Sequence, residues 1–171
     1  MASSMRTRQT VRDMVLSMLA VGGVVFIGYL FLPHSGGDGV HVVDYRSALA
    51  SAKRAAPFPV LGPQGLEDDW RATSVEYRQD KKGHNVWHLG FVTPTGQYAA
   101  IEQSDGEREA VLSEVTLGAK PDGNASVSGE DWQRYQGDKY RGLTRQTGTA
   151  TTVVTGTASY DELARLAQSL K

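Results

Sequence analysis

The chain has 171 residues, a formal net charge of −1 and no cysteine. This length fits one ordinary domain with short extensions. The near-neutral charge argues against a nucleic-acid-binding protein, which needs a basic face to gather phosphates. The absence of cysteine excludes disulfide frameworks, thiolate metal sites and cysteine nucleophiles.

The strongest signal is an apolar stretch near the N-terminus. Residues 14–32, MVLSMLAVGGVVFIGYLFL, contain no charged side chain over 19 positions. A helix of that length spans roughly 28 Å, close to the hydrocarbon thickness of a bilayer. Three arginines precede the stretch and no Lys or Arg follows before Arg46, which predicts a cytoplasmic N-terminus and an external C-terminal part. We therefore expect a basic cytoplasmic segment at 1–13 and a single transmembrane helix at 14–32, in the cytoplasmic (inner) membrane.

A cleaved signal peptide is the alternative interpretation of this stretch. Its apolar region is normally about 7–15 residues long and ends in a small-residue cleavage site. Here the run ends in Leu-Pro-His-Ser, and Ser35-x-Gly37 is only a weak cleavage site. We expect the stretch to be retained as an anchor, although either interpretation delivers the rest of the chain to the outside. A Gly-rich tether at 33–42 follows it.

We expect residues 43–171 to form one extracytoplasmic domain, which begins with a helix that is followed by an extended arm. The stretch 44–56 has a helical pattern, with Asp44 as a cap and a proline as the stop. The next stretch, 57–66, alternates prolines with apolar residues, so it cannot form a helix. The apolar side chains between the prolines favour an extended arm packed on the core over a proline-rich ligand for another protein.

The remaining pattern predicts an α+β domain with an antiparallel sheet. In the strand at 86–93, Trp87, Leu89 and Phe91 share one face, which is typical of a sheet covered on that side. We expect Trp87, and also Trp70 and Trp132, to lie in the core. In all, about six or seven strands are expected, with two or three short helices packed on one face. The stretches with strand patterns are 70–78, 86–93, 97–104, 125–129, 132–136, 140–147 and 149–156.

Two further helices are expected, each at a capping-box spacing. Ser104 and Glu107 have this spacing at the start of 104–117, and a Pro-Asp-Gly-Asn loop follows at 121–124. Ser159 and Glu162 have it at the start of the last helix. We expect this last helix to close the fold by covering a sheet face, and not to serve as a docking helix.

The sequence lacks the motifs that commonly mark a catalytic or ligand-binding site. The chain has no G-x-S-x-G nucleophile motif, no phosphate-binding loop with its lysine and no alternating-acid calcium loop. His84 and His88 are four residues apart, but a turn and a strand would hold them about 13 Å apart, too far to share a metal ion. No catalytic, cofactor-binding or metal-binding residue is therefore predicted, and no cofactor.

The order of these stretches resembles a known family. APFPVLGPQGLEDDWRATSVEY, VWHLGFVTPTGQYAAIEQSD, VSGEDWQRY and VVTGTASYDELARLAQSL, after a membrane span, are similar to the domain-of-unknown-function 4245 family of membrane-anchored proteins from high-GC Gram-positive bacteria. This resemblance implies no activity and no site residue. The last 45 residues or so also resemble exported domains of anti-sigma and lipoprotein-carrier-like proteins, which implies a curved antiparallel sheet.

Three functions stand as hypotheses. The first is a non-enzymatic binding or accessory domain at the outer face of the membrane, with a membrane or cell-envelope protein as partner. The second is a carrier or sensor of a lipid or other apolar ligand held between sheet and helices. The third is an envelope enzyme, which would need a deep polar pocket formed by at least two residues of a set from distant segments: Asp68, Asp69, His88, Glu102 and Asp105. We expect the first.

Overall fold

The computed structural model describes Met14, Ser17, Met18, Val21 and residues 41–171. The expected segment 1–13 lies outside the described residues, as do most of the expected span and tether. Within the described residues, no helix combines the length and the apolar composition needed to cross a bilayer. Val40–Lys171 forms one compact unit, close to the domain expected at 43–171.

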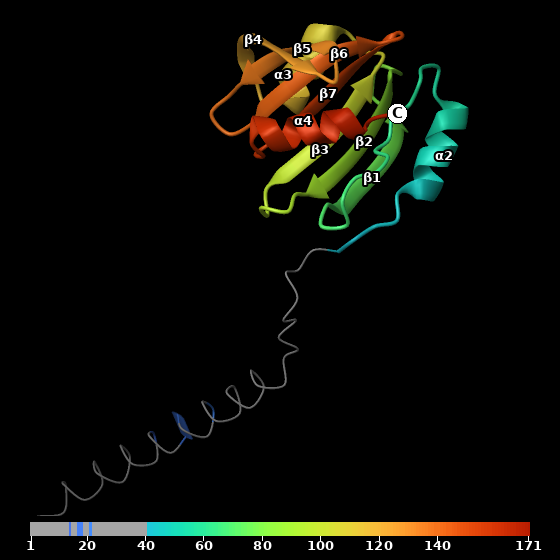
Figure 1. Cartoon of the computed structure of the whole chain (residues 1–171). Helices are drawn as coiled ribbons and strands as arrows, with labels where there is room; N and C mark the ends of the chain where they lie inside the picture. The colour runs from blue at the N-terminus through green and yellow to red at the C-terminus, as the bar shows by residue number, and fades with distance from the viewer. Residues whose placement is uncertain (1–13, 15–16, 19–20, 22–40) are drawn as a thin grey trace, which may run out of the picture. The chain divides into compact units, whose positions relative to one another are not determined.

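This unit is built on one antiparallel sheet of seven strands, in the order β1-β2-β3-β7-β6-β5-β4 (Figure 1). Strand β7 pairs with both β3 and β6, so it joins the β1–β3 meander to the β4–β6 meander. The strands are β1 (Arg71–Gln79), β2 (Asn85–Val92), β3 (Tyr98–Ser104), β4 (Lys120–Val127), β5 (Glu130–Gln136), β6 (Arg141–Thr147) and β7 (Ala150–Gly156). The helices of this unit are α2 (Arg46–Ala55), α3 (Arg108–Val115) and α4 (Tyr160–Ser169). The expected α+β class and antiparallel sheet are confirmed.

The helices do not all cover the same face of the sheet. Leu143 and its cross-strand partner Val154 belong to the core cluster that includes residues of α2 and α4. The next pair, Gly142 and Thr155, points the other way because side chains alternate along a strand. There the Thr155 hydroxyl donates to the carbonyl of Arg141 at 2.8 Å, and its oxygen lies 3.5 Å from the carbonyl oxygen of Val115 in α3. The expectation of helices on one face therefore holds for α2 and α4 but is wrong for α3, which covers polar and small side chains of β6 and β7 on the opposite face.

The space between the sheet and α4 is filled. The side chains that face it include Trp87, Leu89, Ile101, Leu163 and Leu166, and each is 0 % exposed. A void large enough for an acyl chain would leave accessible surface on the residues around it. The interface is therefore a packed core. Trp70 and Trp132, 6 % and 1 % exposed, belong to the same core, as expected.

The arm at 57–66 packs on this core, as predicted. Phe58 and Val60 are buried. The fully buried side chain of Gln103 accepts from the Leu61 N–H at 2.7 Å and donates to the Pro59 carbonyl at 3.1 Å. Because one amide satisfies two backbone groups of the arm, it holds the arm against β3 without a regular strand pairing.

Two local predictions near α3 are wrong. The helix begins at Arg108, and its N-cap Glu107 accepts from the N–H groups of Glu109 and Ala110 at 3.0 and 2.8 Å. Ser104 is the last residue of β3, and its hydroxyl accepts from the Gly106 N–H. A carboxylate inside the loop thus replaces the predicted serine cap.

The loop predicted at 121–124 belongs to β4. This edge strand begins at Lys120, and its pairing with β5 is irregular between Pro121 and Asn124. Proline, a register irregularity and exposed charge are features that discourage further pairing at a sheet edge. The capping box of α4 is confirmed, with Ser159 and Glu162 bonding each other's backbone N–H groups. At α2, Asp44 accepts from the Arg46 N–H at 3.0 Å, but the helix begins at Arg46 and its N-cap residue is Tyr45, so the prediction of Asp44 as the cap is wrong by one residue.

Candidate functional site

Three side chains from adjacent strands form a hydrogen-bonded chain on the sheet face opposite α4. The Ser74 hydroxyl oxygen, on β1, lies 2.7 Å from Nε2 of His88 on β2. The other ring nitrogen, Nδ1, lies 2.6 Å from a carboxylate oxygen of Glu102 on β3. Both imidazole nitrogens are therefore engaged, one by a hydroxyl and the other by a carboxylate.

Strand register brings the three residues together. His88 pairs directly with Glu102, and Ser74 pairs with Gly90, two residues further along β2. A Cβ at Gly90 would lie 2.4 Å from the Ser74 hydroxyl oxygen and 3.2 Å from the hydroxyl oxygen of Tyr98. Glycine at this position therefore makes room for two hydroxyl groups over the backbone of β2.

The site is half-buried, and this shapes its electrostatics. The side chains of His88 and Glu102 are 22 % and 15 % exposed. Burial lowers the pKa of His88, and the charge of Arg78 lowers it further. The hydrogen bond to Glu102 raises this pKa, as do the negative charges of Glu102 and Glu76, and together they outweigh the lowering. The net result is a His88 pKa above its ordinary value.

Tyr98 adds an aromatic hydroxyl to the same face. Its ring lies 6.1 Å from that of Tyr140, centroid to centroid. Burial raises the pKa of Tyr98, and the charge of Glu102 raises it further. The phenol therefore stays protonated and able to donate a hydrogen bond throughout the physiological pH range.

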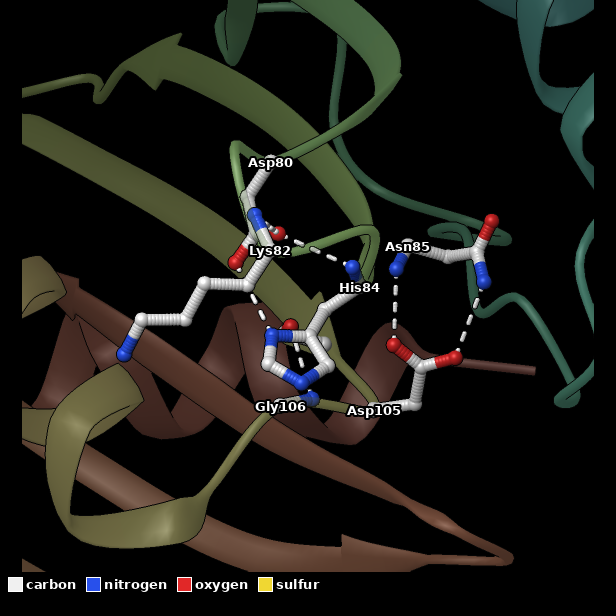
Figure 2. A network of polar contacts seen from close by, with 7 residues as sticks. Asp80, Lys82, His84, Asn85, Asp105 and Gly106 are labelled. Carbon is white, nitrogen blue, oxygen red and sulfur yellow. Dashed lines mark hydrogen bonds and ion pairs between the residues drawn. The ribbon is translucent and has the colours of Figure 1, made fainter.

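A second polar network lies at the end of the sheet, where the β1–β2 turn meets the loop after β3 (Figure 2). Asp80 accepts from the Lys82 and His84 N–H groups at 2.8 and 2.9 Å, and lies 3.0 Å from Nδ1 of His84. Asp105 accepts from the backbone and side-chain amides of Asn85 at 2.7 and 2.9 Å. Desolvation raises the pKa of Asp80, but the bonds from His84 and Lys82 outweigh it and hold that pKa below its usual value. Most of these bonds satisfy loop backbone, so the network fixes the turn.

The structure shows which of the candidate residues named from the sequence lie together. His88 and Glu102 meet, whereas Asp105 turns to Asn85 and His84 to Asp80. Asp68 and Asp69 are exposed before β1. Among residues 41–171 and the four described N-terminal residues, no cluster of three His, Asp or Glu side chains could hold a metal ion.

Sequence reasoning missed Ser74. Strict alternation would place it on the core face together with Ala72, but the register shifts between these two residues and turns Ser74 to the opposite face. Ala72 and Val75 both pack with the core, although strict alternation would place residues three positions apart on opposite faces. This break in the alternation is the signal that could have revealed the shift.

The His88–Glu102 pair predicts a pH-dependent contribution to stability. Because the folded-state pKa of His88 is raised, this contribution is fully present below the unfolded-state value of about 6.5 and is lost as pH rises through the folded-state pKa. We expect the difference in unfolding free energy between the natural protein and His88→Asn to shrink as pH rises from about 6 to 9. Urea unfolding of both proteins at several pH values would measure it. A difference that grows with pH would contradict the assignment.

Comparisons with known proteins show a family and a distant similarity to a solved structure. Residues 6–170 match the profile of a family described as "Protein of unknown function (DUF4245)". The comparison with curated proteins finds no match. Among solved structures, the chain is similar to one described as "Crystal structure of MucB in complex with MucA(peri)", with 14% identity and a TM-score of 0.40. That similarity covers 65% of this chain but only 35% of the other, and at this TM-score we draw no functional argument from it.

Proposed function

Since the chain belongs to the DUF4245 family of proteins of unknown function, we propose a function from its own residues: a binding or accessory domain, anchored by residues 14–32, at the outer face of the cytoplasmic membrane. The compact unit begins at Val40, close to the end of the expected tether. The described core residues and the partly buried residues packed on them all lie after position 42. This compact unit has a core of its own, and the apolar stretch at 14–32 precedes it in the sequence, where it would serve as the anchor.

The observation that carries the binding role is the filled sheet–helix interface. An internal carrier needs a cavity, and the fully buried side chains of Trp87, Leu89 and Leu166 leave no room beside them for an acyl chain. A ligand or partner must then bind from outside. The polar face of β1–β3, with His88, Glu102 and Tyr98, offers such a surface, and this supports a surface-binding domain over the lipid carrier.

Protease accessibility in protoplasts tests the anchor and its orientation. The full chain would carry a C-terminal epitope, and we expect it to stay in the membrane fraction after alkaline carbonate extraction. External protease should remove the epitope while a cytoplasmic marker survives. A shortened, soluble form would contradict the anchor, and an epitope protected in intact protoplasts would contradict the orientation.

Site-specific photo-crosslinking in whole cells tests the binding role. A photoreactive residue would replace Arg78, which is exposed on the polar face of β1, with Lys120 on the opposite edge as the matched control. We expect a discrete crosslinked band from position 78 that is weak or absent from position 120, with its partner identified by mass spectrometry. Equal, diffuse crosslinking from both positions would count against a defined binding face.

A further inference from the structure

The Ser74–His88–Glu102 chain has the parts of an activated nucleophile. In such a triad, a base takes the hydroxyl proton through one imidazole nitrogen, and a carboxylate holds the other nitrogen in the correct tautomer. Here the two distances are 2.7 and 2.6 Å, within hydrogen-bond range on both sides of the ring. The residues lie on three paired strands, which fix their relative positions better than loops would.

We propose that Ser74 is a nucleophile, activated by His88 and oriented through Glu102, that takes the acyl group of a carboxylic ester. This activity goes beyond the binding role and departs from the sequence-based expectation of a non-enzymatic domain. It does not depend on the membrane anchor or on a protein partner. Its success or failure is therefore separable from that of the proposed function.

The acyl transfer proceeds in two stages, acylation of Ser74 and hydrolysis of the acyl-serine. The Ser74 oxygen attacks the carbonyl carbon and forms the new C–O bond, while its proton passes to Nε2 of His88. The C–O bond to the leaving alcohol then breaks, and the alcohol departs with that proton. Water repeats the sequence on the acyl-serine and releases the acid. Glu102 stays ionised throughout and accepts the Nδ1 hydrogen bond.

A hydrogen-bond donor for the developing oxyanion lies beside the nucleophile. The hydroxyls of Ser74 and Tyr98 both border the small space above Gly90. Tyr98 keeps its proton because burial and the charge of Glu102 oppose its ionisation. A neutral phenol next to the attacked carbonyl can stabilise the negative charge that forms on its oxygen.

Access to the site follows from its place in the fold. It lies on the face opposite α4, and α3 packs on β7, two strands away from His88. Ser74 is only partly buried, and Glu76 and Arg78 on the same face of β1 are exposed. An ester at the end of a chain can therefore approach from solvent.

A fluorophosphonate probe tests the proposal, because it forms a stable adduct only with an activated serine. The detergent-solubilised full chain would be treated with the probe and analysed by intact mass and peptide mapping. We expect a single adduct on Ser74, formed faster as pH rises through the His88 pKa, because His88 must be neutral to take the proton. Ser74→Ala should abolish the adduct, and His88→Gln should slow it at least about 10²-fold.

The controls separate chemistry from folding. Ser126→Ala, at an exposed serine on β4, should leave labelling unchanged. Glu102→Gln should slow labelling while circular dichroism shows a folded protein, which covers the case in which His88→Gln does not fold. The proposal is overturned if the folded natural protein gives no adduct on Ser74 across pH 6–9. It is equally overturned if Ser74 is labelled in the His88→Gln and Glu102→Gln variants as fast as in the natural protein.

Discussion

Replacing Leu163 with aspartate is expected to unfold the domain between Val40 and Lys171. Leu163 is 0 % exposed and lies in the core cluster that joins α4 to the sheet. A carboxylate there has no partner and either stays charged in an apolar site or takes up a proton, and the packing of the leucine is lost in both cases. We expect a loss above about 4 kcal/mol in unfolding free energy, measured by urea denaturation followed by tryptophan fluorescence.

Two further variants calibrate this result. Leu163→Ala should cost about 2–5 kcal/mol without adding a charge. Gln168→Asp places the same carboxylate on an exposed position of α4 and should cost less than about 1 kcal/mol. A Leu163→Asp protein that stayed folded but lost a binding partner would contradict the structural role of α4 and would indicate a docking helix instead.

Gly156→Ala is expected to have the second largest effect. Gly156 has φ +154°, and a Cβ there would lie 2.1 Å from the carbonyl oxygen of Tyr98 and 2.8 Å from its carbonyl carbon. The clash is with backbone, because Gly156 pairs with Ala99 in the β3–β7 ladder. Neither strand can yield without breaking the junction between the two meanders. We expect a loss of at least about 3 kcal/mol, measured by urea unfolding.

Gly96→Ala is the matched control. Gly96 has φ +78°, but a Cβ there would meet nothing within 4 Å. Its cost should be the backbone penalty alone, about 1–2 kcal/mol. Equal losses of unfolding free energy in the two variants would show that the cost at both positions comes from the positive φ alone. The predicted clash between β3 and β7 at Gly156 would then be wrong.

The parts of the fold that sequence predicts well are those determined by local periodicity. The alternation of Trp87, Leu89 and Phe91 correctly identified the core face of β2, and Ser159 with Glu162 correctly identified the start of α4. Both signals come from residues only a few positions apart. They persist because tertiary contacts reinforce the local preference.

The parts that sequence missed depend on long-range contacts. The face covered by α3 is decided by packing against β6 and β7, far along the chain. The position of Ser74 beside His88 depends on one register shift in β1, which reverses the face of the residues after it. His88 and Glu102 were named as candidates among five, but only the pairing of β2 with β3 shows that these two meet.

The central claim is the hydrogen-bonded chain of Ser74, His88 and Glu102 on the polar face. The pKa of His88 tests this claim most directly. An NMR titration of the His88 ring in the natural protein and in Glu102→Gln would measure that pKa. We predict a value above the ordinary one of about 6.5 in the natural protein, and a lower value when the carboxylate becomes an amide. A His88 pKa at or below about 6.5 that does not change in Glu102→Gln would contradict the hydrogen-bonded chain from Ser74 through His88 to Glu102.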